Sequence, residues 1–225
     1  MATLFEKPRR RAMTPRPALP RIPALENGDR LTVGEFMRRY HAATGVRKAQ
    51  LIEGFVHMPS PVNATHHAKP DGIIQLWLGT YSLDHPELEV YPNATLILDG
   101  DNAVQPDAIL CQPQRGGAVW LDDDGNLHGA PGLVCEIAST SASIDLHAKF
   151  QAYRRNGVAE YLVWIVQEKS VRWFLLEDGD CIQQKEVVGT LASKKFPGLT
   201  LDVKALLKQD KAKLIEGLKR TAKRR

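Results

Sequence analysis

Two carboxylates stand in apolar segments that have the pattern of buried strands. Asp107 opens the run Asp107-Ala108-Ile109-Leu110, and Glu136 lies near the end of Leu133-Val134-Cys135-Glu136-Ile137. A buried carboxylate is unfavourable unless it is paired with a cation or binds a metal. Lys149 follows on a stretch with a helical pattern. Two acids on strands and a lysine on the next helix indicate a divalent-metal site.

The same residues also permit a second interpretation, a structural cluster of ion pairs among Asp107, Glu136 and Lys149 without a metal. Spacing alone favours this simpler interpretation. Asp145 precedes Lys149 by four residues, a spacing that stabilises helices whatever the function. A choice between the two interpretations therefore needs more than the spacing of these residues.

The local patterns around these residues predict an α/β fold with a mixed central sheet flanked by helices. The segment 133–166 has the order strand, helix, strand, which predicts a parallel crossover. Helices are expected at 32–43, 66–82 and 143–156, and a lysine-rich helix is expected from residue 203 onward. Strands are expected at 49–52, 55–58, 88–91, 95–98, 107–110, 119–121, 133–137, 160–166, 170–176 and 181–187.

Charge divides the chain into three parts. Residues 1–30 hold seven Lys or Arg against three acids, and five prolines, which predicts a disordered basic arm. Residues 204–225 hold nine Lys or Arg against two acids and are expected to form a basic C-terminal helix or tail, whereas residues 31–203 are acidic overall and are expected to form the folded domain. An acidic body suits a cation-binding cleft, and basic ends suit contact with a polyanion. Alternatively, the ends serve only solubility.

Three widely separated cysteines, Cys111, Cys135 and Cys181, are expected to be reduced thiols, because no metal-binding spacing joins them. The N-terminal residues contain arginines but no apolar stretch of the kind found in signal peptides. The longest apolar run, Tyr161–Val166, is too short to span a bilayer. These features predict a cytoplasmic protein with no membrane association.

An ordered series of short motifs extends over roughly residues 31–203. The motifs are Leu51-Ile52-Glu53-Gly54, Met58-Pro59-Ser60-Pro61, Gln105-Pro106-Asp107, Leu133-Val134-Cys135-Glu136-Ile137-Ala138-Ser139, Asp145 with Lys149 and Tyr153, and Gly157-Val158-Ala159-Glu160-Tyr161. Taken together, these motifs resemble the Uma-two family of endonucleases. The resemblance implies the restriction-endonuclease-like fold of the PD-(D/E)XK superfamily and Mg²⁺-dependent hydrolysis of DNA.

The resemblance implies that Asp107 and Glu136 bind one hard cation, Mg²⁺ or Mn²⁺, together with the backbone carbonyl of Ile137 and waters. Lys149 would orient the attacking water or offset charge in the transition state. The superfamily lysine normally follows the glutamate by two residues, where this chain has Ala138. A long flexible side chain can reach one point from different backbone positions, so a lysine on the next helix is physically reasonable.

Glu53 matches an acidic position of the family and is a candidate third acid of the site; an ordinary turn residue is the alternative. His66 or His67 could approach the cleft, although a surface cap of the helix is the preferred interpretation for both. Superfamily nucleases are often dimers, which by analogy makes a homodimer an expectation to test.

Two functions of different classes are consistent with these observations. The first is a metal-dependent endonuclease acting on DNA, and the second is a non-catalytic nucleic-acid-binding or interaction module on the same fold. The full set of Asp107, Glu136 and Lys149 favours the enzyme, because a module without a reaction has no chemical need for all three. A weaker third option is a structural protein that oligomerises through its sheet.

Overall fold

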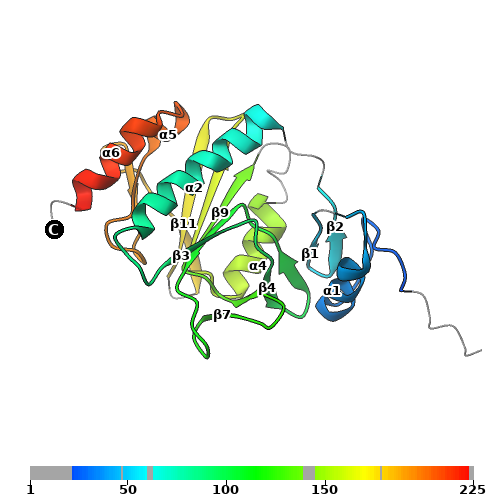
Figure 1. Ribbon diagram of the computed structural model, residues 1–225. Coiled ribbons are helices and arrows are strands. Elements are labelled where there is room, and N and C mark those ends of the chain that lie inside the picture. The colour runs from blue at the N-terminus through cyan, green and yellow to red at the C-terminus, as the bar shows by residue number, and fades with distance from the viewer. Residues whose placement is uncertain (1–21, 47, 60–62, 139–144, 178, 223–225) are drawn as a thin grey trace, which may run out of the picture.

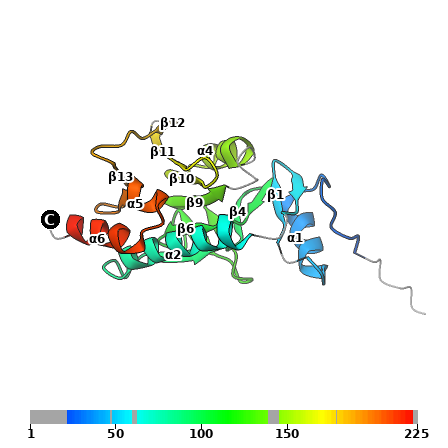
Figure 2. The same cartoon turned by 90° about the horizontal axis from the view of Figure 1, so that it is seen from above.

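The computed structural model describes residues 22–46, 48–59, 63–138, 145–177 and 179–222. Its main body has three layers, most clearly seen from above (Figure 2). A central sheet lies between α2 (Lys69–Ser82) with α6 (Lys211–Ala222) on one side and α4 (Phe150–Arg155) on the other. The helix α1 (Val33–Ala42) packs with the hairpin of β1 (Gln50–Ile52) and β2 (Phe55–His57) at one end of the molecule (Figure 1). The predicted mixed α/β architecture is confirmed.

The central sheet has six strands in the order β12-β11-β10-β9-β6-β3. Strands β9 and β10 run parallel, with Glu136 paired to Val163, and the other neighbours are antiparallel. The predicted parallel pairing across segment 133–166 is therefore confirmed. The strands are β3 (Glu89–Pro92), β6 (Ala108–Cys111), β9 (Leu133–Ala138), β10 (Glu160–Ile165), β11 (Ser170–Glu177) and β12 (Asp180–Gln183).

A second six-stranded sheet, in the order β2-β1-β5-β4-β8-β7, extends the fold beyond the single sheet expected. Its strands β5 and β8 were not expected, because neither Asn102-Ala103-Val104 nor Leu127-His128-Gly129 is rich in the β-branched and aromatic residues that mark a strand in a sequence. The strands are β1 (Gln50–Ile52), β2 (Phe55–His57), β4 (Leu96–Asp99), β5 (Asn102–Val104), β7 (Val119–Leu121) and β8 (Leu127–Gly129), and β13 (Thr190–Ala192) pairs separately with β14 (Thr200–Asp202).

Several helical segments begin at capping side chains that the sequence provides. The Thr32 hydroxyl accepts a hydrogen bond from the Glu35 amide, and the Asn63 side chain accepts from the amides of Thr65 and His66. Such bonds satisfy amides that the helix itself leaves without partners. The helices are α1 (Val33–Ala42), the π-helical turn η1 (Ala64–Ala68), α2 (Lys69–Ser82), the π-helical turn η2 (Asp145–Lys149), α4 (Phe150–Arg155), α5 (Val203–Leu207) and α6 (Lys211–Ala222). Residues 143 and 144 of the expected third helix lie outside the described residues.

The alternation of side chains along β9 decides which face of the sheet carries the polar site. Leu133, Cys135 and Ile137 pack in the core shared with α2. Val134 and Ala138 pack in the other core, which Tyr153 of α4 joins. Because successive side chains of a strand point to opposite faces, Glu136 lies on the α4 side. Full burial of each large apolar side chain contributes about 1.5–3 kcal/mol, so both cores hold this strand firmly.

Residues N-terminal to the expected domain boundary at residue 31 already pack against the folded body. Leu25 is buried in a cluster with Phe36, and the Gly28 amide donates to the Val56 carbonyl oxygen. Residues 1–21 of the expected basic arm lie outside the described residues. No helix among the residues described is long and apolar enough to cross a membrane.

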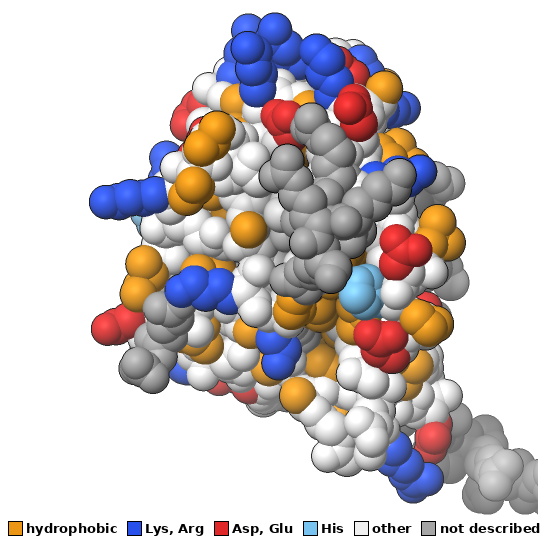
Figure 3. Space-filling view, turned by 90° about the vertical axis from the view of Figure 1, so that its left-hand side faces the viewer, with side chains coloured by type: hydrophobic (Ala, Val, Ile, Leu, Met, Phe, Trp, Pro, Cys, Tyr) orange, Lys and Arg blue, Asp and Glu red, His pale blue; other side chains and the backbone are white. Residues whose placement is uncertain are grey.

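The segment of α5 and α6 carries exposed basic side chains. Figure 3 looks onto the side of the molecule where these helices lie and shows Lys and Arg side chains gathered along its upper edge. The apolar side of the same segment is buried, because Leu206, Leu214 and Leu218 belong to the core shared with α2. The exposed lysines of the segment are Lys204, Lys208, Lys211, Lys213 and Lys219.

Candidate active site

Asp107 and Glu136 are neighbours across two adjacent strands. Ala108 of β6 pairs with Cys135 of β9, so Asp107, one residue earlier, lies beside Glu136. The Asp107 carboxylate accepts a hydrogen bond from the Ile137 amide through Oδ2, at 2.7 Å. Both acids are almost fully buried, with 3% of each residue exposed. The structure thus brings together the two carboxylates on which the sequence analysis centred.

The helix that follows β9 supplies the partners of Glu136. Lys149 Nζ lies 2.8 Å from Glu136 Oε1 and 3.1 Å from Asp145 Oδ1. The Tyr153 hydroxyl donates to the same Glu136 oxygen at 3.0 Å. The Tyr161 hydroxyl donates to the backbone carbonyl oxygen of Asp145 and so fixes the start of this helix to β10. Lys149 therefore lies between two buried carboxylates, one on the strand and one on its own helix.

Two further basic side chains contact Asp107 from other elements. His67 Nε2 of η1 lies 3.3 Å from Asp107 Oδ1, and Lys48 Nζ lies 3.6 Å from the same oxygen. The preference for a surface cap is wrong for His67, whose side chain is only 16% exposed. Lys48 was missed altogether, because its distance from Asp107 along the chain carries no periodic signal.

Burial and neighbouring charges shift the pKa values of these groups in opposite directions. Burial raises the pKa of Glu136 to about 8, with the carboxylates of Asp145 and Asp107 adding to the effect and Lys149 opposing it. Burial favours the protonated form of Asp107 too, but His67, Lys48 and the Ile137 amide outweigh it, so the pKa of Asp107 is lowered.

The two basic partners respond to the same carboxylates. Burial alone would lower the pKa of Lys149, but Glu136 and Asp145 raise it above the usual value for lysine. The hydrogen bond to Asp107 raises the pKa of His67. Each strand carboxylate therefore has its own basic partners, Glu136 on the helix side and Asp107 on the side of His67 and Lys48.

Glu53 lies in a different set of contacts. Its carboxylate forms an ion pair with Arg155 at 2.8 Å, and Arg155 also lies 3.5 Å from Asp99. Glu53 occupies the turn between β1 and β2 with a positive φ of 53°, and its amide donates to the Asn102 side chain. These contacts place Glu53 with Arg155 rather than with Asp107 or Glu136.

The donor set fits a hard divalent cation. Within the described ranges, no three His, Cys, Asp or Glu side chains are grouped so that they could hold a metal by themselves. Mg²⁺ is usually held by only one or two carboxylates, with waters completing its octahedral shell. Asp107 and Glu136 provide two such carboxylates side by side, and the backbone of Ile137 adjoins both.

Comparison with known proteins decides the family. The profile of the Uma2 family, which is described as "Putative restriction endonuclease", matches residues 33–204. This chain belongs to the Uma2 family. Its fold is similar to that of a crystal structure from Anabaena variabilis, titled as a putative nuclease belonging to DUF820, with a TM-score of 0.61 over 79% of this chain and 98% of that chain. The two sequences are 14% identical, so the likeness concerns the fold. No curated protein sequence matches.

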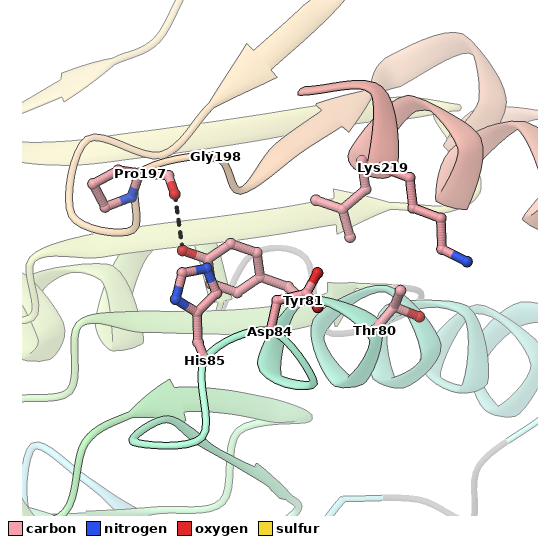
Figure 4. A pocket seen from close by; sticks show the side chains of 8 residues that line it. Thr80, Tyr81, Asp84, His85, Pro197, Gly198 and Lys219 are labelled. Carbon is pink, nitrogen blue, oxygen red and sulfur yellow. Dashed lines mark hydrogen bonds between the residues drawn. The ribbon is translucent and has the colours of Figure 1, made fainter. Parts of the chain in front are cut away.

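A pocket of this Uma2 protein lies at the C-terminal end of α2 (Figure 4). It measures about 360 Å³ and is lined by Tyr81, His85, Pro197 and Lys219, among others. The Tyr81 hydroxyl donates to the Pro197 carbonyl oxygen at 3.1 Å. None of the acids around Lys149 lines this pocket, so it is separate from the candidate active site.

Proposed function

We propose that this Uma2 protein is a metal-dependent endonuclease that hydrolyses DNA phosphodiester bonds. The observation that carries the proposal is the side-by-side position of Asp107 and Glu136 on adjacent strands, with Lys149 in contact with Glu136. Membership of a family described as restriction endonucleases and the likeness to a nuclease fold support the reaction class.

In this proposal Asp107, Glu136 and the Ile137 carbonyl hold Mg²⁺ or Mn²⁺. Such an ion supplies charge stabilisation at the scissile phosphate and lowers the pKa of a water molecule. The chain itself must supply carboxylates free of their protons and in a fixed geometry. The Ile137 amide fixes Asp107, and Tyr153 together with Lys149 fixes Glu136. Fixed ligands lose little entropy when they bind.

Lys149 is the proposed catalytic cation. Its ammonium is held between Glu136 and Asp145, so its position is set before a substrate binds. From there it would orient the attacking water or offset the charge that develops on the phosphate. Glu53 enters the proposal only through the family pattern, because its contact with Arg155 supports the alternative of a turn residue.

The proposal is tested by incubating the full chain with supercoiled plasmid and Mg²⁺ or Mn²⁺. The wild type should nick or cut the plasmid, and Asp107→Asn or Glu136→Gln should lower the rate about 100-fold or more. Asp123→Asn is the matched control, because Asp123 is exposed in the β7–β8 turn. Cleavage at the same rate by the wild type and both site variants would contradict the proposal.

One observation favours the second candidate, a nucleic-acid-binding module without a reaction. Lys149 pairs with Glu136, and Lys48 and His67 pair with Asp107, so the carboxylates are compensated without a metal. Such a module would bind DNA without cleaving it in any divalent metal, and Glu136→Gln would leave its DNA affinity unchanged. The plasmid assay and a DNA-binding measurement on the same variant therefore separate the two candidates.

A further inference from the structure

Lys48 and His67 lie between the buried Asp107 carboxylate and solvent. The side chain of Asp107 is 4% exposed, whereas those of His67 and Lys48 are 16% and 26% exposed. Lys48 comes from the segment before β1, and His67 comes from η1, so two separate elements bring basic groups to one carboxylate. Lys48 and His67 are therefore more accessible to solvent than Lys149, whose side chain is only 6% exposed.

The two oxygens of Asp107 have different partners. Oδ2 accepts from the Ile137 amide at 2.7 Å, a bond that fixes the carboxylate to the sheet. Oδ1 is the oxygen nearest to His67 and Lys48, at 3.3 and 3.6 Å. A divalent cation bound at Oδ1 would repel the Lys48 ammonium and compete with it for the same lone pairs.

Lys48 already has a second acceptor outside the acidic cluster. Its Nζ donates to the Asn93 side-chain oxygen at 2.8 Å, which is shorter than its distance to Asp107. Release from Asp107 therefore leaves Lys48 anchored near the site. Partly exposed basic groups that lose their carboxylate to a metal are free to bind another anion at the same place.

We propose that Lys48 and His67 bind a phosphate group of the DNA strand beside the scissile bond, after a divalent cation has taken their place on Asp107. This inference rests on the proposed function and adds a phosphate-binding role to two residues outside the Asp107, Glu136 and Lys149 set. Lys48 would act as a point charge toward the phosphate and His67 as a hydrogen-bond donor through Nε2.

The test measures the affinity of the full chain for a short DNA duplex by fluorescence anisotropy, in Ca²⁺ and in EDTA. Ca²⁺ binds carboxylate oxygens and serves as the metal probe. In Ca²⁺, Lys48→Met and His67→Gln should each weaken binding roughly tenfold. Lys48→Met should also reduce the salt slope of log K by about one. In EDTA both effects should be several-fold smaller, because Asp107 retains the two side chains.

Lys185→Met is the control, because Lys185 is exposed after β12, at the far edge of the central sheet. Calorimetry with Ca²⁺ alone gives a second readout: Lys48→Met should bind Ca²⁺ as tightly as the wild type or more tightly, since a competing cation is removed. The inference would be overturned, with the proposed function left standing, by either of two results. In the first, Lys48→Met and His67→Gln lose no more DNA affinity than Lys185→Met does; in the second, their losses are as large in EDTA as in Ca²⁺. A wild type that binds no Ca²⁺ would overturn the proposed function and the inference together.

Discussion

The Glu136 carboxyl group lies among partners of both charges. Lys149 and Tyr153 donate to its Oε1, while Asp107 and Asp145 bring negative charge close to it. Burial dominates this balance and raises the pKa of Glu136 to about 8. Two carboxylates that share a site repel one another, and one of them takes up a proton when no cation is present. The raised pKa of Glu136 and the lowered pKa of Asp107 indicate that the proton goes to Glu136.

Metal binding should therefore depend on pH and release a proton. Below pH 8 Glu136 must lose its proton before it can bind a cation, so affinity for Mg²⁺ or Mn²⁺ should rise from pH 6 to 8 and level off above. Calorimetry at pH 7 in two buffers of different ionisation enthalpy measures the proton released, which should approach one per metal. Glu136→Gln should release fewer protons per metal than the wild type, because only His67, whose pKa is raised by Asp107, can still lose one. A wild-type affinity that is constant over this range would contradict the assignment.

Replacing the buried lysine should affect both activity and stability. Lys149→Met should abolish cleavage and lower the free energy of unfolding by about 3 kcal/mol at pH 8, because it leaves Glu136 and Asp145 buried without their cation. The loss of stability should be smaller at pH 5, where the carboxylates can take up protons. Urea unfolding at the two pH values measures the difference. An equal loss at both values would show that the ion pairs are not its cause.

The helix after β9 positions its polar side chains by a simple repeat. Asp145, Lys149 and Tyr153 are spaced by four residues, so they lie along one side of η2 and α4. That side faces Glu136, with contacts from Lys149 and Tyr153. The strand–helix–strand unit therefore carries most of the site, and its rigidity depends on how β10 is held.

A second buried acid, Glu160, fixes the start of β10 to the neighbouring elements. Glu160 accepts hydrogen bonds from the Lys194 and Lys195 amides at 2.7 and 2.8 Å and from the Trp173 ring at 3.2 Å. These bonds attach the loop after β13 to the central sheet. Glu160→Gln leaves these three donors one neutral acceptor oxygen in place of a carboxylate, so it should lower the free energy of unfolding by about 2 kcal/mol.

The measurement is chemical denaturation, with the exposed Glu168→Gln as the matched control. Metal affinity of Glu160→Gln should stay at the wild-type value, because Glu160 pairs with Leu133 at the start of β9 and Glu136 lies three residues further along. Loss of metal binding without loss of stability would assign Glu160 to the site instead of to the scaffold.

At the scale of the whole molecule, charge separates the folded body from the ends of the chain. The net charge is +4, yet residues 204–225 alone hold nine Lys or Arg against two acids. The lysines of α5 and α6 lie on the outer surface of this segment (Figure 3). Phosphate contacts by such residues raise DNA affinity without regard to sequence and make it sensitive to salt.

A variant with Lys204, Lys208 and Lys211 changed to Gln tests this role. If these lysines contact phosphates, the slope of log K for DNA against log salt should fall by up to about three, since each contact contributes about 0.9. Binding titrations at several salt concentrations give the slope. The control changes three exposed basic residues elsewhere, Arg115, Lys169 and Lys185, to Gln. Equal slopes in the wild type and both variants would leave the basic segment with a role in solubility only.

The sequence by itself determined the features that depend on short repeats along the chain. The apolar run around Glu136 specifies a strand, and the spaced apolar positions on both sides of Lys149 specify a helix. Thr32 and Asn63 specify where two helical segments begin. These features follow from periodicity and capping over a few residues, so they can be recognised in the sequence alone. The family pattern added the expectation that Asp107 and Glu136 meet.

Only the tertiary structure decided which residues far apart in the sequence form ion pairs with one another. It placed His67 and Lys48 on Asp107, and it placed Glu53 on Arg155. It also added the strands β5, β8 and β13, and a second large sheet, to the single sheet expected. Contacts between residues tens of positions apart depend on strand register and on the paths of the connections, and neither leaves a repeat in the sequence.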